Sequence, residues 1–236
     1  MSNRTLYQAG RYAMKLCARL MLQMDIVHEA GLPDGPRIIA PNHPTTLDPF
    51  LIPTLIAEQV HILVTESAFN VPVLGRYLWS AGHIPVVTGS GHMAFEAAKT
   101  LLMDGQSVVI FPEGALSPLN GRLCKPHTGV ARLALVTGAP VIPVGIHLQY
   151  DRIRFVETTI KGQSEIARWY FHGPYSVTVG KPMHIGGDVE DRDYVVAISE
   201  RIMRRILRLS QQSAYRMTGL APAVPIRDTA EIPSLN

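Results

Sequence analysis

Apolar residues recur along much of the chain at the three- to four-residue spacing of amphipathic helices. Several of these segments are followed by residues that end helices, such as Gly105 and Gly138. A short helix is also expected from Leu47, directly after a turn-like stretch. The longer segments predict helices over Thr5–Met24, Val71–Ser80, Gly91–Asp104, Val130–Thr137 and Val189–Gln212.

Short runs rich in β-branched residues lie between these helices and predict the strands of a sheet. Pro143 falls inside one run, which indicates an edge strand or a bulge. Because helices alternate with buried strands, we expect one α/β domain with a mixed, mostly parallel sheet flanked by helices, and with the N-terminal helix beside it. The predicted strands are Arg37–Ala40, His61–Thr65, Ser107–Phe111, Pro140–His147, Tyr150–Val156 and Tyr175–Val179.

Turn-forming residues divide the chain into three parts. The cluster Gly31–Pro36 separates the first helix from the strands and helices after it. A tail containing proline and alanine comes after Gly219. We therefore expect an amphipathic helix within 1–30, one folded domain over 31–219 and a coil over 220–236.

The N-terminal helix is basic as well as amphipathic. A basic amphipathic helix can lie in a membrane interface, with its cationic side chains near lipid phosphates. It can also pack on its own domain with those side chains solvated, and the two interpretations are compatible if each uses one face. The basic residues are Arg4, Arg11, Lys15 and Arg19.

The composition narrows the class of protein. The 236 residues are 47% hydrophobic, which allows one substantial core, and the net charge of +3 is too diffuse to indicate nucleic-acid binding. A mild basic excess suits contact with an anionic membrane surface. Cys17 and Cys124 match no metal or redox spacing, which favours a reduced, cytosolic protein. No signal peptide or bilayer-spanning apolar run is evident, so we expect a soluble or peripheral protein.

The strand at Arg37–Ala40 leads into a stretch in which His43 and Asp48 stand five positions apart. The Asp48 carboxylate can fix the tautomer of the ring, which leaves the other ring nitrogen free to take a proton from a hydroxyl. No protein nucleophile accompanies this pair, so the nucleophile can be the substrate. The alternative is a strand-end histidine beside a carboxylate that caps a helix.

A second polar loop comes after the buried strand Ser107–Phe111. Open α/β sheets bind ligands at the carboxyl ends of their strands, where this loop is expected. Glu113 can accept a hydrogen bond from a substrate hydroxyl, or it can cap the next turn. Gly114 allows a ligand to approach the backbone closely.

Asn42-His43-Pro44-Thr45-Thr46-Leu47-Asp48, followed by Phe111-Pro112-Glu113-Gly114, resembles the glycerolipid acyltransferase family of the lysophosphatidic acid acyltransferase type. That family carries a His-x4-Asp motif, a Phe-Pro-Glu-Gly-Thr-Arg-Ser motif and a Val-Pro-Val-type strand in this order. Val141–Ile146 stands in the place of the strand, and the resemblance covers roughly Gly31–Ile146. It implies that 31–219 is an acyltransferase domain.

The resemblance also implies which residues meet the substrates. His43 would be the general base, Asp48 would orient it, and Val141–Ile146 would line a slot for the acyl chain. The substrate-binding residues of the two motifs would be Asn42, Thr46, Glu113, Gly114 and Ser117.

Two arginines that hold the acceptor phosphate in the family are replaced here. Thr88 and Leu116 stand in their places. Losing two bidentate, charge-assisted contacts weakens phosphate binding, which favours a neutral or differently charged acceptor. The alternative is a phosphate held by other basic residues, for which the candidates are Arg122, Lys125 and Arg76.

We therefore expect an enzyme that moves a fatty acyl group from acyl-CoA or acyl-ACP to a hydroxyl of a lysophospholipid or related acceptor. We expect no cofactor beyond that thioester, no metal and no nucleic-acid partner, and a peripheral position at the cytoplasmic face of a membrane. The alternatives are a hydrolase in which His43 activates water, and a non-catalytic lipid-binding module. A further alternative is a metal site built from His43, Asp48, Glu113 and His127.

Overall fold

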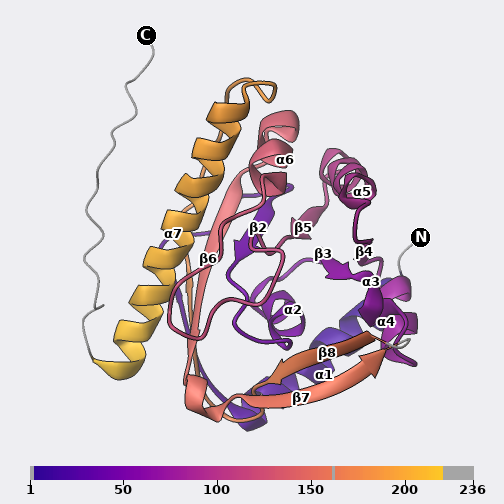
Figure 1. Ribbon diagram of the computed structural model, residues 1–236, viewed down its shortest axis with the longest axis vertical. Coiled ribbons are helices and arrows are strands. Elements are labelled where there is room, and N and C mark those ends of the chain that lie inside the picture. Colours follow the sequence, from indigo (N-terminus) through magenta and orange to yellow (C-terminus); the bar gives the residue numbers. More distant parts are fainter. Residues whose placement is uncertain (1–2, 161–162, 220–236) are drawn as a thin grey trace.

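The computed structural model describes residues 3–160 and 163–219, and the coil predicted over 220–236 lies outside them. Nine strands are described: β1 (Leu22–His28), β2 (Ile38–Pro41), β3 (Val60–Thr65), β4 (Ile84–Val86), β5 (Ser107–Val109), β6 (Val141–Leu148), β7 (Arg154–Ile160), β8 (Gln163–Trp169) and β9 (Gly173–Val179). Seven form one sheet in the order β1-β9-β6-β2-β5-β3-β4. Figure 1 shows the part of this order from β6 through β2, β5 and β3 to β4. Each neighbouring pair in it is parallel except β6 with β9. The predicted mixed, mostly parallel α/β sheet is confirmed.

Helices accompany the sheet, and within the described residues none is long and apolar enough to cross a membrane. The helices are α1 (Arg4–Met21), α2 (Asp48–Leu51), α3 (Glu66–Phe69), α4 (Leu74–Ser80), α5 (Gly91–Met103), α6 (Gly129–Thr137) and α7 (Arg192–Thr218), with 3-10 turns at Ile52–Leu55 and Tyr150–Arg152. Those predicted at the N-terminus, around 71–80, at 91–104, at 130–137 and at 189–212 are confirmed, with different bounds.

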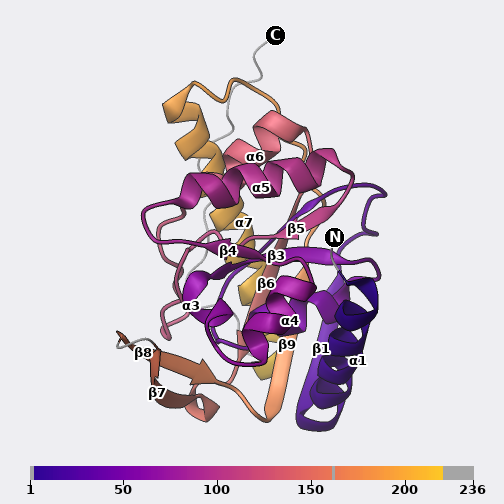
Figure 2. The same cartoon turned by 90° about the vertical axis from the view of Figure 1, so that its right-hand side faces the viewer.

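Alternate residues of the central strands face two separate cores. Ile38 of β2 belongs to the core under α5, α6 and α7, whereas its neighbour Ile39 belongs to the core under α1 and α2. β6 divides in the same way at Val141 and Ile142. Figure 2 shows α5 and α6 on one side of the strands β3, β4 and β5, and α1 and α4 on the other. The sheet is therefore covered on both faces.

The N-terminal helix is shorter than predicted, because the chain turns directly into a strand. α1 ends at Met21 rather than Met24, and Leu22 has an extended backbone with φ −109° and ψ 139°. β1 then pairs in parallel with β9, from Leu22 beside Gly173 to His28 beside Val179. The segment 1–30 thus supplies an edge strand of the sheet, and the division of the chain at residue 30 stays a prediction.

Of the two alternatives predicted at Pro143, the edge strand is wrong and the bulge agrees with the pairing: Val144 faces Val179 but Val141 faces Met183, so the antiparallel register shifts by one residue across Pro143. β6 lies inside the sheet between β9 and β2, and its register with β2 is continuous through this residue. The Pro143 carbonyl accepts a 2.9 Å hydrogen bond from the N–H of Gly180, just beyond the end of β9. Because Pro143 lies at this bulge, between the bridge of Val141 with Met183 and the ladder that begins at Val144, its missing N–H removes no ladder hydrogen bond.

The region after β6 departs most from the predicted elements. Tyr150 lies in a 3-10 turn rather than a strand. β7 and β8 form an antiparallel hairpin that projects from the large sheet, and β8 has no counterpart among the predicted strands (Figure 2). α7 begins at Arg192 rather than Val189, because the Asp191 carboxylate accepts a hydrogen bond from the N–H of Tyr194 at 3.0 Å and caps the helix there.

Candidate active site

The two polar loops lie together at one edge of the sheet. His43 lies two residues after β2, and Phe111 lies two residues after β5. Because β2 and β5 are adjacent parallel strands, their carboxyl ends meet there. The imidazole of His43 stacks on the ring of Phe111, with centroids 4.1 Å apart and planes inclined by 28°. The stacking fixes the plane of the histidine ring.

The Asp48 carboxylate orients His43 within that plane. Nδ1 of His43 lies 3.1 Å from Oδ2 of Asp48, and Asp48 is completely buried at the start of α2. With Oδ2 as the acceptor, Nδ1 carries the proton and Nε2 becomes the basic nitrogen. No residue in the described part of the chain bonds to Nε2, and the His43 side chain is 17% exposed. A histidine held in this way can act as a general base toward a ligand.

Three further hydrogen bonds support Asp48. The N–H of Thr45 donates to Oδ2 at 2.7 Å, and the Thr45 hydroxyl donates to Oδ1 at 2.7 Å. The third donor is the phenol of Tyr175 on β9, also at 2.7 Å from Oδ1. A buried carboxylate needs such donors because an unpaired one is costly. The sequence contains no signal for Tyr175, since its partner is far away along the chain.

Glu113 ties its own loop to the His43 loop. The Ser117 hydroxyl donates to Oε1 at 2.5 Å, and the His43 N–H lies 3.2 Å from the same oxygen and 2.9 Å from the Ser117 hydroxyl. The N–H of Cys124 donates to Oε2 at 2.8 Å. Glu113 and Ser117 are both buried. The two bonds from the His43 N–H hold its backbone, whereas Phe111 and Asp48 hold its ring.

Gly114 occupies a position that other residues do not fit. Its φ is +62°, in the left-handed region that favours glycine. A Cβ built there would lie 2.6 Å from Cδ2 of His127. The backbone of Gly114 is exposed, so a ligand can approach it from outside.

Asn42 lies directly before His43 and Thr46 lies between His43 and Asp48, and the side chains of both bond to backbone. The Asn42 amide accepts from the N–H of Ile146 at 2.7 Å and donates to its carbonyl at 3.0 Å, which extends the pairing of β2 with β6. The N–H of Thr46 donates to the Arg168 carbonyl at 2.9 Å, and its hydroxyl accepts from the Arg168 N–H at 2.9 Å. Their contact with substrate stays a prediction.

The basic residues singled out in the sequence lie at the surface. Arg122 and Lys125 are exposed in the loop before α6, and Arg76 is exposed on α4. Arg168 on β8, which was not among them, is half-buried and donates from Nη1 to the Ser117 carbonyl at 2.5 Å. Sequence reasoning missed Arg168 because the motifs end before the hairpin begins.

Tyr150 lies near the two polar loops, whereas His83 does not. Burial raises the pKa of the Tyr150 phenol, and the charges of Glu113 and Asp48 add to the rise, so a protonated phenol lies near both carboxylates. His83 is buried away from the loops and accepts a 3.2 Å hydrogen bond from the N–H of Ile62. Within residues 3–160 and 163–219, no three His, Cys, Asp or Glu side chains gather as a metal site.

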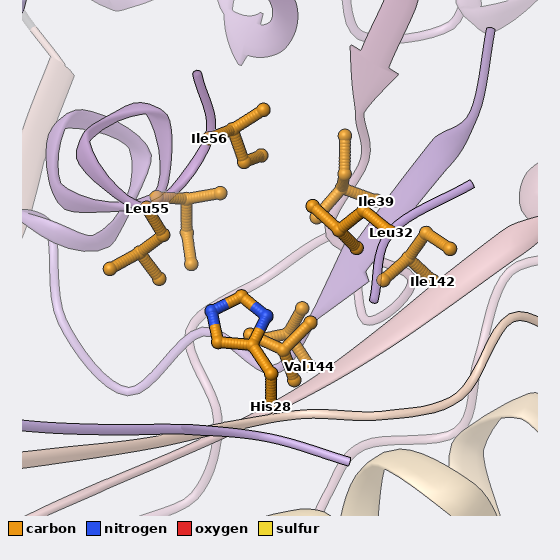
Figure 3. A pocket seen from close by; sticks show the side chains of 9 residues that line it. His28, Leu32, Ile39, Leu55, Ile56, Ile142 and Val144 are labelled. Atoms are coloured by element: carbon orange, nitrogen blue, oxygen red, sulfur yellow. The ribbon is translucent and has the colours of Figure 1, made fainter. Parts of the chain in front are cut away.

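An apolar hollow opens on the α2 face of the sheet. Figure 3 shows Leu55 and Ile56, just after α2, facing Ile39 and Val144 of the central strands, with the His28 ring at one side. Ile39 lies four residues before His43, which corresponds to roughly 13 Å along a strand. The full lining is His28, Leu32, Ile39, Ile52, Leu55, Ile56, Ile142, Val144 and Val179.

Comparison with known proteins assigns this site to a family. Residues 23–147, more than half of the chain, match the sequence model of the family described as Acyltransferase. The chain belongs to this family, and the resemblance drawn from the motifs is confirmed. The match ends before the β7–β8 hairpin and β9, so Arg168 and Tyr175 lie outside it.

Two curated relatives are both named 1-acyl-sn-glycerol-3-phosphate acyltransferase. The chain is 29% identical to the coconut (Cocos nucifera) protein over 136 residues, which cover 53% of this chain and 44% of the relative. It is 29% identical to a chloroplastic protein of Brassica napus over 114 residues, which cover 47% of this chain and 33% of the relative. The match therefore spans less than half the length of each relative.

A solved structure shares the fold. The crystal structure of the 1-acyl-sn-glycerophosphate (LPA) acyltransferase PlsC from Thermotoga maritima superposes with a TM-score of 0.59, over 87% of this chain and 78% of that one. The two sequences are 21% identical. At this identity the likeness supports the arrangement of strands and helices.

Proposed function

We propose that the chain transfers a fatty acyl group from an acyl thioester to a hydroxyl of a lysophospholipid, with His43 as the general base. The observation that carries this proposal is the 3.1 Å contact between Nδ1 of His43 and the buried Asp48, with Nε2 left for a substrate. Neither loop presents a serine or cysteine to Nε2, so the attacking oxygen is that of the acceptor.

The reaction balances with these groups alone. Nε2 takes the proton of the acceptor hydroxyl as its oxygen forms a bond to the thioester carbonyl carbon. The tetrahedral intermediate then collapses, the carbon–sulfur bond breaks, and the thiolate takes the proton back from Nε2. Asp48 keeps Nδ1 protonated throughout and stabilises the imidazolium. General-base assistance of this kind contributes about 10²–10⁴-fold.

The acceptor we propose is lysophosphatidate or a close relative. The names of the two curated relatives support this class. Thr88 and Leu116 in place of arginines weigh against a phosphate held in the usual way. Arg122 and Lys125 are exposed in the adjoining loop and remain proposed contacts to the substrate.

The motif residues would act at different distances from the chemistry. The exposed backbone of Gly114 would contact the acceptor. Glu113 and Ser117 would position the His43 backbone and bound hydroxyls. Asn42 and Thr46 would hold the loop that carries the catalytic pair, through their bonds to β6 and β8.

The apolar hollow is the proposed place of the acyl chain. It contains Ile142 and Val144 of the strand expected to line that slot, whereas Val141 faces the opposite core. The donor would be acyl-CoA or acyl-ACP, because His43 needs only a thioester carbonyl.

Peripheral contact with a membrane is proposed for α1. Tyr7, Met14 and Ala18 face the body of the protein. A second apolar stripe recurs at helical spacing on the solvent side and includes exposed Tyr12, Leu16 and Leu20, with Leu20 76% exposed. Each face of the helix thus has its own apolar stripe, which supports both roles expected from the sequence.

The test is thiol release from a panel of acyl-CoAs, with and without lysophosphatidate, for the wild type and His43→Ala. His92→Ala, which removes an exposed histidine of α5, is the matched control. Release that requires lysophosphatidate and is lost only in His43→Ala supports the transferase. Release without acceptor that still depends on His43 indicates the hydrolase instead, and unchanged release in His43→Ala overturns the assignment of the base.

A further inference from the structure

Arg168 is attached directly to the catalytic loop. Its backbone N–H and carbonyl bond to the hydroxyl and N–H of Thr46, both at 2.9 Å. Thr46 lies between Thr45, which donates twice to Asp48, and Asp48 itself. The end of β8 is therefore held beside the His43–Asp48 pair by two backbone contacts.

The Arg168 side chain also reaches the second loop. Nη1 donates to the Ser117 carbonyl at 2.5 Å, and the Ser117 N–H donates to the His43 carbonyl at 2.7 Å. The guanidinium thus lies where the two loops adjoin. Its charge also acts on Cys124, where it opposes the rise in thiol pKa caused by burial and by Glu113.

Arg168 has no acidic partner among the described residues. The carboxylate of Glu113 is already bonded to Ser117, His43 and Cys124. Other well-covered arginines in this protein do have acidic partners: Arg37 pairs with Glu58, Arg205 with Glu29 and Arg216 with Asp25.

The chemistry of a guanidinium defines the ligand. It has five N–H donors in a planar fork, and the one contact to Ser117 leaves most of them unused. A half-buried cation without a counter-charge gains most from an anion that binds with two oxygens, and phosphate has that geometry. A neutral acceptor offers no such partner.

We propose that Arg168 determines acceptor specificity by binding the phosphate of the acyl acceptor beside His43. This inference rests on the proposed acyl transfer. It locates the cation on the hairpin, outside the segment that matches the family. A phosphate of CoA is the other source of the same chemistry, so the experiment must separate acceptor from donor.

The kinetic test compares two acceptors that differ in charge. Initial rates are measured with one acyl-CoA and either lysophosphatidate or monoacylglycerol, for the wild type, Arg168→Gln and Arg168→Lys. We expect Arg168→Gln to lower kcat/KM for lysophosphatidate by about 10- to 100-fold, to change that for monoacylglycerol by less than about threefold, and we expect Arg168→Lys to recover part of the loss. Arg154→Gln removes the same charge from an exposed site on the hairpin and should leave both values unchanged.

A binding measurement makes the inference independent of turnover. Titration of hexanoyl lysophosphatidate, and separately of CoA, into His43→Ala with and without Arg168→Gln reports each affinity directly. A loss of affinity for lysophosphatidate alone supports the inference, even if the wild type transfers no acyl group and the proposed function fails. Equal affinities, a loss for CoA instead, or equal kinetic losses for both acceptors overturn it.

Discussion

The phenol of Tyr175 lies 2.7 Å from Oδ1 of Asp48, although 127 residues separate them in the chain. Burial raises the pKa of Tyr175 well above its ordinary value, and the charge of Asp48 adds to the rise. The phenol therefore remains a hydrogen-bond donor at neutral pH. The orientation of His43 depends on β9 as well as on its own loop.

Tyr175→Phe should slow the reaction without weakening the binding of either substrate. The variant keeps the ring but removes one donor from Asp48, so His43 is held less firmly. We expect kcat to fall about tenfold, or about 1.4 kcal/mol in the activation free energy. Tyr170→Phe is the control, since Tyr170 is also buried but donates to the Pro174 carbonyl. Equal kcat losses in both variants would show a general effect of destabilisation.

Gly114→Ala should impair the enzyme for two reasons that can be separated. The alanine meets the φ of +62° and the ring of His127, whereas Gly121→Ala meets a φ of +76° with no atom within 4 Å. We expect Gly121→Ala to lower the free energy of unfolding by about 1 kcal/mol and Gly114→Ala by more. Chemical denaturation of both measures the difference. If adding His127→Ala to Gly114→Ala does not recover stability, the clash with His127 is not the cause of the additional loss.

Stability should fall between pH 6.5 and pH 4 because of His83. Burial lowers the pKa of His83 to about 4, and the charge of nearby His61 contributes. In this range the unfolded chain binds a proton that the folded chain does not, so the free energy of unfolding decreases as the pH falls. The contribution is complete above pH 6.5 and amounts to about 3 kcal/mol.

Urea denaturation at several pH values measures this slope. His83→Asn retains an acceptor for the N–H of Ile62 but cannot charge, so its slope between pH 6.5 and 4 should be shallower by nearly one proton. His92→Asn on α5 should keep the slope of the wild type. Parallel curves for the wild type and His83→Asn would contradict the prediction, whatever their offset.

Binding to vesicles should depend on the outward stripe of α1. Leu16→Glu with Leu20→Glu places two charges on that stripe and should reduce partition onto phosphatidylcholine–phosphatidylglycerol vesicles at least about tenfold. The control is Met93→Glu with Met103→Glu, which alters two exposed apolar residues of α5. Flotation of all three proteins decides, and equal binding by all three counts against α1 as the membrane contact.

The sequence predicted the features that depend on residues close together in the chain. His43 and Asp48 are five positions apart, and Glu113 comes after a recognisable strand, so their loops could be placed at one edge of a parallel sheet. Tyr175 and Arg168 reach the same edge from β9 and β8. The position of Tyr175 depends on where β9 is inserted in the sheet, and that of Arg168 on where the β7–β8 hairpin joins the domain. Neither is specified by a local sequence pattern.

Strand β1 was missed because its residues carry little local signal. β1 has an exposed burial pattern over most of its length, and its register is specified by β9 alone. An edge strand with little apolar periodicity resembles the continuation of the helix before it. The predicted elements with buried, β-branched residues, such as His61–Thr65, agree with β3 to within one residue.

The pairing of β1 with β9 also delays folding during translation, because β1 is synthesised long before its partner. Asp25 on β1 and Ser176 on β9 are 151 residues apart, and a ribosome adds about 5–20 residues per second. For roughly 8–30 s after β1 is made, its partner strand β9 has not yet been synthesised. During this time β1 is unpaired, and the apolar inner face of α1 lacks part of the core on which it packs. Because β9 also carries the phenol that holds Asp48, a nascent chain cannot complete the surroundings of the His43–Asp48 pair before Tyr175 has been made.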